Sequence, residues 1–178
     1  MNNVFAHSGA FGSVYEGKYG TKKVAIKTFH TNKFEKMNED QQRSAMNEFL
    51  VMKEIRHSNV VRVFGFTKYQ GLLALVMELA ENGTLKDIIE SQMFRENMGL
   101  QYEALLQIAS GMEYIHLKNI LHRDLKPDNV LVFSFSDSLI KIKITDFGVS
   151  RVSSLYSCSF CFEYNIISVT GRNYTRFN

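Results

Sequence analysis

Residues 122–129 read HRDLKPDN, and this charged octet decides the fold more than any other stretch of the chain. Its proline is the only one in the sequence, and it comes shortly after a long helical pattern. Because a proline ends a helix and stiffens the loop around it, the loop holds Asp124, Lys126 and Asn129 in a fixed relation. A carboxylate can accept a proton from a hydroxyl, an ammonium can balance phosphate charge, and an amide oxygen is a hard ligand for magnesium. The octet therefore predicts a site for phosphate chemistry.

A second acidic residue strengthens this interpretation. Asp146 ends an apolar strand pattern 17 residues after Asn129, and Phe147 and Gly148 follow it. The alternative is a polar surface turn with a capping Asp, which accounts for one acidic residue but not for the octet followed by Asp-Phe-Gly. We favour a functional site, because the two motifs together form a signature of phosphoryl transfer.

Composition and charge bound the class of protein. The 178 residues are 45% hydrophobic and 22% charged, as in one globular domain or two small lobes. The longest apolar run, Leu72–Met77, is far shorter than the ~20 residues that cross a bilayer, so we expect no membrane span. The net charge of +3 is small and dispersed, so we expect no nucleic-acid partner. Two cysteines make no disulfide framework and predict a reduced, cytoplasmic setting.

Hydrophobic periodicity predicts a strand-rich first part and a helix-rich second part, joined at residues 78–82. The first part is expected to hold a hairpin at 13–28 with its turn at 18–21, a helix at 39–56, and strands at 60–66 and 72–79. The second is expected to hold helices at 85–91 and 100–118 and strands at 130–133 and 140–144. The longer helix is expected to bury one face, made of Leu105, Ile108, Ala109, Met112 and Ile115.

Two motifs near the start of the chain fit a phosphate site. Residues 9–14, GAFGSV, place a glycine turn between two strand patterns. A simple hairpin turn is the alternative. The motif is neither a Rossmann fingerprint nor a Walker A motif, since a strand follows and no Lys-Ser or Lys-Thr comes directly after the second glycine. Residues 24–27, VAIK, then place Lys27 at the end of a strand pattern. Alone, such a lysine is usually solvated.

Glu48 supports a functional role for Lys27. It precedes Phe49 on the apolar face of the helix predicted at 39–56, where an unpaired carboxylate is costly. Lys27 is the natural partner for its charge. The alternative is a glutamate at the edge of the apolar stripe that reaches water. We favour the ion pair.

Taken in order, these motifs resemble a eukaryotic protein kinase domain over residues from about 5 to 151. The matching segments are the glycine loop, VAIK, the helix with Glu48, MELAENGTL at 77–85 as a hinge, HRDLKPDN and DFG. The resemblance implies an α+β, two-lobe fold: an antiparallel sheet with one helix at 1–80 and a helical, incomplete lobe at 81–151. Residues 152–178 are expected to form a divergent, disordered tail.

The resemblance implies a role for each catalytic residue. Asp124 is expected to be the catalytic base, and Lys126 to steady the transferred phosphate. Lys27 is expected to hold the α- and β-phosphates of ATP, oriented by Glu48. Two oxygen ligands are expected to bind Mg²⁺: Asn129 and Asp146.

The nucleotide site implied by the resemblance lies along the glycine loop, the VAIK strand and the hinge. Met77 occupies the gatekeeper position, and residues 78–80 are expected to offer backbone groups to adenine. The expected ATP-binding residues are Ala6, Ser8, Gly9, Ala10, Phe11, Gly12, Val14, Ala25, Lys27, Met77, Glu78 and Ala80.

The segment after Asp124 bears on the substrate. Its Lys-Pro-Asp-Asn form is similar to kinases that act on serine and threonine in protein substrates, and residues 61–66 resemble the tyrosine-kinase-like group. Two alternatives remain open: a non-catalytic fragment that binds nucleotide or competes for partners, and a kinase of small molecules that shares the loop motifs. Transfer of phosphate to protein discriminates among the three.

The sequence departs from the family pattern at both ends. His7 stands where the family has its first loop glycine. No Ala-Pro-Glu follows Arg151 in the last 27 residues, so we expect a kinase truncated at its carboxyl end, possessing a loosely packed larger lobe. Cys158 and Cys161 resemble half a zinc site, but no Cys or His follows them, and we interpret them as incidental.

Overall fold

The computed structural model describes residues 5–9, 12–29, 52–69, 72–147 and 151–152. They divide into two compact units. The N-terminal unit contains residues 5–9, 12–29, 52–53, 63–69 and 72–79, and the C-terminal unit contains residues 54–62, 80–147 and 151–152. Residues 54–62 therefore belong to the C-terminal unit, although the residues directly before and after them in the chain belong to the N-terminal unit.

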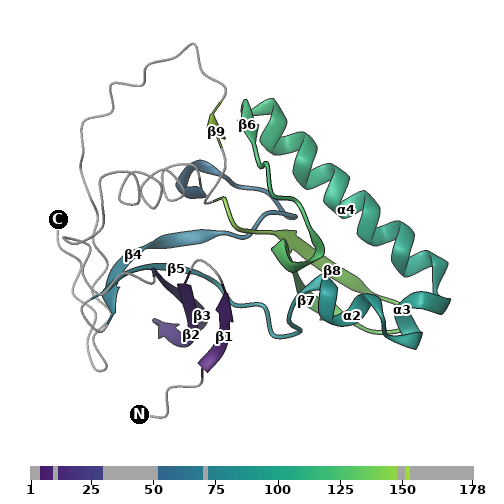
Figure 1. The fold of residues 1–178 in the computed structure, drawn as a ribbon, viewed down its shortest axis with the longest axis horizontal. Coiled ribbons are helices and arrows are strands. Elements are labelled where there is room, and N and C mark those ends of the chain that lie inside the picture. Colours follow the sequence, from purple (N-terminus) through teal and green to yellow (C-terminus); the bar gives the residue numbers. More distant parts are fainter. Residues whose placement is uncertain (1–4, 10–11, 30–51, 70–71, 148–150, 153–178) are drawn as a thin grey trace. The chain divides into compact units, whose positions relative to one another are not determined.

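The N-terminal unit is a five-stranded antiparallel sheet in the order β1-β2-β3-β5-β4 (Figure 1). Its strands are β1 (Phe5–Gly9), β2 (Gly12–Tyr19), β3 (Lys22–Phe29), β4 (Val63–Tyr69) and β5 (Leu72–Glu78). The predicted hairpin is confirmed as β2 and β3, and its turn contains Gly20 at φ +62°, a conformation that glycine adopts without strain.

The central strands β3 and β5 form the core of this sheet. Val24, Ile26, Ala74 and Val76 are buried together, with Tyr15 and Phe64 packed against them. The opposite face of β5 is also buried at Leu75 and Met77, so this strand is covered on both faces. The helix predicted at 39–56 lies outside the described residues except for its end, where residues 52–54 are helical.

The C-terminal unit is built around one long helix and a hairpin. Helices α2 (Leu85–Ile89), α3 (Gln92–Glu96) and α4 (Met98–Leu117) precede the short strand β6 (Ile120–Leu121) and the 3₁₀ turn η2 (Pro127–Asn129). The hairpin of β7 (Val130–Phe135) and β8 (Ile140–Ile144) then packs along α4, and β9 (Arg151–Val152) pairs with β6 (Figure 1). The predicted helices and strands are confirmed, while α3 was not expected.

Side chains cap these helices as their sequence suggests. Thr84 precedes α2, and its backbone N–H and hydroxyl donate to the Asp87 carboxylate at 2.7 and 2.8 Å. Asn97 separates α3 from α4, and its side-chain oxygen accepts from the Leu100 N–H at 3.0 Å. The other end of the Asn97 amide donates to the Asp137 carbonyl at 2.9 Å, which joins the start of α4 to the tip of the β7–β8 hairpin.

The buried face of α4 differs from the prediction. Leu105 is 65% exposed and Ala109 is exposed, whereas Leu100, Ala104, Gly111 and Ile115 are buried. The helix approaches its neighbours most closely at Gly111, where an added Cβ would lie 2.9 Å from the Asn59 carbonyl oxygen and from Ile144. The residues of α4 at this contact are small. The predicted face was identified mainly from large apolar side chains, and it therefore lies to one side of the contact. Of the predicted face, Ile115 is buried and Ile108 packs against the core.

The other side of α4 carries exposed apolar side chains. Met98, Tyr102, Leu105 and Leu117 are 78%, 65%, 65% and 76% exposed. Within the described part of the chain, no helix is both long and apolar enough to span a membrane.

Candidate active site

The octet at 122–129 folds into a loop that gathers three of the predicted site residues. The Asp124 carboxylate accepts hydrogen bonds from the Lys126 ammonium at 2.7 Å and from the Asn129 side-chain amide at 2.9 Å. The same Asn129 nitrogen donates to the Asp124 carbonyl at 2.8 Å. The turn η2, begun by Pro127, brings Asn129 back onto Asp124.

These contacts keep the loop charged. The hydrogen bond from Lys126 lowers the pKa of Asp124, and the bond from Asn129 acts in the same direction, against partial desolvation. The same bond to Asp124 raises the pKa of Lys126. At neutral pH the carboxylate is therefore ready to accept a proton and the ammonium retains its charge.

His122 joins this loop to the segment after β8. Its ring is buried, and its Nδ1 accepts from the Asp124 N–H at 3.3 Å. The proton therefore sits on Nε2, which donates to the Thr145 carbonyl at 2.9 Å. The ring also packs on Phe147, with centroids 5.0 Å apart. Sequence reasoning missed this role, because the bond joins residues 23 positions apart in the chain.

Two strained backbone positions flank the site. Arg123 has φ +69° and Asp146 has φ +65°, in the left-handed region that costs a non-glycine residue roughly 1–2 kcal/mol. Such conformations persist where neighbouring contacts hold them, and they concentrate at functional sites. Here the Thr145 N–H donates to the Asn129 carbonyl at 3.0 Å, so the residues before Asp146 are tied to the loop.

Asn129 and Asp146 offer a donor set that fits magnesium. Both described hydrogen bonds of the Asn129 side chain go through its nitrogen, which leaves the amide oxygen for a ligand. Magnesium is typically held by one or two protein oxygens, with waters and phosphates completing its shell. Among the described residues no three His, Cys, Asp or Glu side chains gather into a metal site of their own. The chemistry of this pair suits a metal shared with a phosphate ligand.

Asp128 belongs to the loop but not to this cluster. Its carboxylate accepts from the Lys86 ammonium at 2.9 Å, which lowers the pKa of Asp128 and ties the 3₁₀ turn to α2. Both side chains are well exposed.

In the N-terminal unit, sheet register groups the predicted nucleotide residues. Lys27 on β3 lies opposite Val14 on β2 and Leu75 on β5, while Ala25 lies opposite Met77. Because side chains two apart and directly opposite share a face, these positions share one face of the sheet. Ala25 and Met77 are buried there.

The remaining predicted residues lie at the ends of strands or outside the described part. Ala6, Ser8 and Gly9 belong to β1, and Gly9 lies opposite Gly12 at the start of β2. Glu78 ends β5, and Ala80 is the first described residue of the C-terminal unit after it. Glu48, Ala10 and Phe11 lie outside the described residues, so the pairing of Lys27 with Glu48 stays a prediction.

Comparison with known families agrees with the motifs. The family described as Protein kinase domain matches residues 7–168. This chain is a member of the protein kinase domain family. The predicted kinase fold is thereby confirmed, and the N-terminal sheet corresponds to the strand-rich lobe of that family.

Individual relatives carry the same family name. Serine/threonine-protein kinase STY46 of Arabidopsis thaliana is 33% identical over 147 residues, which are 83% of this chain and 24% of that protein. The probable serine/threonine-protein kinase kinX of Dictyostelium discoideum is 34% identical over 173 residues, 94% of this chain and 15% of that protein. The probable serine/threonine-protein kinase fhkA of the same organism is 38% identical over 148 residues, 81% of this chain and 25% of that protein. The chain thus spans about a quarter or less of these relatives.

Proposed function

We propose that this kinase domain transfers the γ-phosphate of ATP to serine or threonine hydroxyls of a protein substrate, with Mg²⁺ as cofactor. One observation carries the proposal: the Asp124 carboxylate is held by the Lys126 ammonium at 2.7 Å in a loop that also fixes Asn129. Support for the substrate class comes from the relatives, which are named serine/threonine-protein kinases. Placement in the tyrosine-kinase-like group stays a prediction.

In this proposal Asp124 accepts the proton of the substrate hydroxyl as its oxygen attacks the γ-phosphorus and ADP leaves. The Asp124 carboxylate is ionised at neutral pH and can accept this proton, and its lowered pKa means that it keeps its charge as the pH falls. The Lys126 ammonium holds Asp124 and has further N–H groups with which to neutralise charge on the transferred phosphate.

The nucleotide is proposed to lie against the face of the sheet that carries Val14, Ala25 and Met77, with Lys27 on its phosphates. Glu48 is proposed to orient Lys27, and residues 78–80 to bind adenine through backbone groups. Asn129 and Asp146 are proposed to hold magnesium, which supplies electrostatic stabilisation of the phosphates when bound. The β1–β2 turn is proposed to cover the phosphates: Ala6, Ser8, Gly9, Ala10, Phe11 and Gly12.

A matched pair of substitutions tests the role of Asp124. Asp124→Asn removes the base and is expected to lower the rate of phosphate transfer to a serine- and threonine-containing protein by roughly 10²–10⁴. Asp128→Asn makes the same change four residues away, on a carboxylate bound to Lys86, and is expected to stay near the parent rate. A thermal-shift measurement of magnesium-ATP binding by both variants controls for correct folding. Equal rates for parent and Asp124→Asn reject this role.

The exposed apolar side of α4 favours one alternative, a non-catalytic fragment that binds partners through this helix. Met98, Tyr102 and Leu105 are each at least 65% exposed, and exposed apolar clusters often mark interaction surfaces. A chain that binds magnesium-ATP but transfers no phosphate to protein supports this alternative over the kinase reaction.

A further inference from the structure

The edge of β8 that faces away from β7 has hydrogen-bond partners, although among the described residues no third strand joins the β7–β8 sheet. Without these partners the edge would present open backbone groups. At its far end, the Ile144 N–H donates to the Asn59 carbonyl at 2.8 Å, and the Val61 N–H donates to the Ile144 carbonyl at 2.9 Å. The segment 59–61 thus pairs with the end of β8 that leads to Asp146.

Gln107 of α4 pairs with the rest of that edge. Its side-chain nitrogen donates to the Ile140 carbonyl at 2.8 Å, and its side-chain oxygen accepts from the Ile142 N–H at 2.9 Å. One donor and one acceptor at this spacing are what the N–H and C=O of a single residue in a partner strand provide. The amide therefore takes the place of a strand residue.

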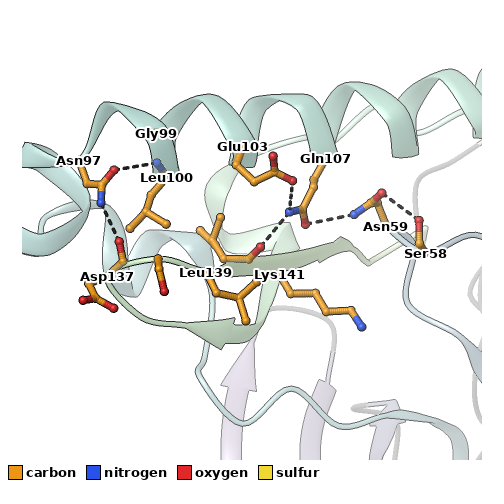
Figure 2. A pocket seen from close by; sticks show the side chains of 12 residues that line it. Ser58, Asn59, Asn97, Gly99, Leu100, Glu103, Gln107, Asp137, Leu139 and Lys141 are labelled. Carbon is orange, nitrogen blue, oxygen red and sulfur yellow. Dashed lines mark hydrogen bonds between the residues drawn. The ribbon is translucent and has the colours of Figure 1, made fainter.

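Two further contacts fix the orientation of the Gln107 amide. Its oxygen also accepts from the Asn59 side-chain nitrogen at 3.1 Å, and its nitrogen donates to the Glu103 carboxylate one turn earlier on α4 at 2.9 Å (Figure 2). Asn59 completes the edge by donating to the Ile142 carbonyl at 3.2 Å. The amide is thereby anchored to a 20-residue helix and linked to segment 59–61.

This anchor is relevant to the site because β8 leads to Asp146. Ile142 and Ile144 lie four and two residues before Asp146, whose backbone is strained at φ +65°. His122 and Asn129 hold Thr145 from the side of the loop. Contacts on Thr145 and contacts on the edge of β8 thus both act on the segment that leads to Asp146.

We propose that Gln107 is a positioning residue for Asp146: its side-chain amide, acting as a substitute strand, fixes β8 and so the metal ligand at the end of β8. This inference rests on the proposed function, in which Asp146 holds magnesium.

The surroundings of Gln107 allow the idea to be tested in a folded chain. Gln107 lines an open cavity of about 660 Å³, together with Asn59, Glu103 and Leu139 (Figure 2). Water can enter there and satisfy the edge of β8 when the amide is removed. A variant is then expected to lose the constraint on β8 without leaving buried polar groups unpaired.

Amide hydrogen exchange of the full chain without metal or nucleotide gives the direct test. Gln107→Met keeps the length of the side chain but removes its donor and acceptor, and is expected to speed exchange at Ile142 about tenfold. The Val132 N–H serves as the internal reference, because Val132 lies on β7 and its N–H donates to the Gly83 carbonyl, away from Gln107.

Gln101→Met is the matched control on the same helix. Gln101 donates to the Phe94 and Arg95 carbonyls and has no described bond to β8. It is expected to leave exchange at Ile142 unchanged.

Magnesium titration tests the link to Asp146. With nucleotide present, the Mg²⁺ concentration that gives half of the thermal stabilisation is expected to rise about tenfold in Gln107→Met, the low end for groups that orient metal ligands. It is expected to stay at the parent value in Gln101→Met. Binding of nucleotide in the presence of a chelator is expected to be equal in all three proteins.

Three results overturn the proposal. They are equal acceleration at Ile142 and Val132, which reports general destabilisation; no acceleration at Ile142; and faster exchange at Ile142 with an unchanged magnesium requirement. A parent chain that magnesium nucleotide does not stabilise contradicts the proposed function instead, while the exchange rates still decide whether Gln107 holds β8.

Discussion

Side chains in the loop at 122–129 are held in place by hydrogen bonds from neighbouring residues of the same loop. Asp124 is held by a lysine two residues on and by an asparagine five residues on. These local contacts follow from the spacing of the octet and the turn at Pro127, which is why this cluster could be predicted from the sequence. His122 binds Thr145, 23 residues away along the chain, and no local pattern indicates that bond.

The lowered pKa of Asp124 leads to a prediction at this scale. Lys126→Met removes the largest cause of the shift, so the pKa of Asp124 is expected to rise. Because a base acts only when deprotonated, the acid limb of the normalised rate–pH profile should move to higher pH. For the parent, a pKa below the ordinary 3.8 means that Asp124 adds stability above that pH and loses it as the pH falls further.

Lys86→Met provides the matched control for this pH profile. It removes the ammonium that lowers the pKa of Asp128 and leaves Asp124 with its own partner. The acid limb is expected to stay in place in this variant. An unmoved limb in Lys126→Met would show that another group sets it.

At the scale of elements, α4 meets β8 beside a point where the helix comes close to the Asn59 backbone and the Ile144 side chain. Gly111 allows this approach, and Gln107 one turn earlier supplies the hydrogen bonds. The helix and the strand were each predictable from periodicity, because that signal is local. Which face of the helix meets the strand was predicted wrongly, since the contact is made by small and polar residues that carry little hydrophobic signal.

A glycine substitution tests this packing. Gly111→Ala places a Cβ 2.9 Å from the Asn59 carbonyl oxygen and from Ile144, so it is expected to destabilise the unit by roughly 1–3 kcal/mol despite the better helix propensity of alanine. Chemical denaturation measures the change. Gly99→Ala, in the exposed first turn of the same helix, is expected to change stability by less than about 1 kcal/mol. Equal effects of the two would contradict close packing at Gly111.

At the scale of the whole molecule, the residues proposed to carry the kinase reaction are divided between the two compact units. Lys27 belongs to the N-terminal unit, and Asp124, Asn129 and Asp146 belong to the C-terminal unit. Under the proposed function, nucleotide binding therefore reports on residues of both units.

A thermal melt of the 178-residue chain provides that report. Magnesium-ATP is expected to raise the melting temperature, because a ligand at 100 times its Kd stabilises the folded state by about 2.7 kcal/mol. Lys27→Ala is expected to lose most of that shift, since its ammonium would hold the phosphates. Lys23→Ala, on the same strand and facing Glu16, is expected to keep it. A parent without any shift would contradict a nucleotide site in this chain.

By itself the sequence determined the kinase family, the order of the motifs and the composition of the loop at 122–129, because each depends on residues close together in the chain. Only the tertiary structure decided which face of α4 is buried, that His122 holds Thr145, and that Gln107 completes the edge of β8. Those contacts join residues 23 to 35 positions apart. Their partners are backbone carbonyls and N–H groups, which every residue possesses, and no side-chain pattern marks the ones that will be used.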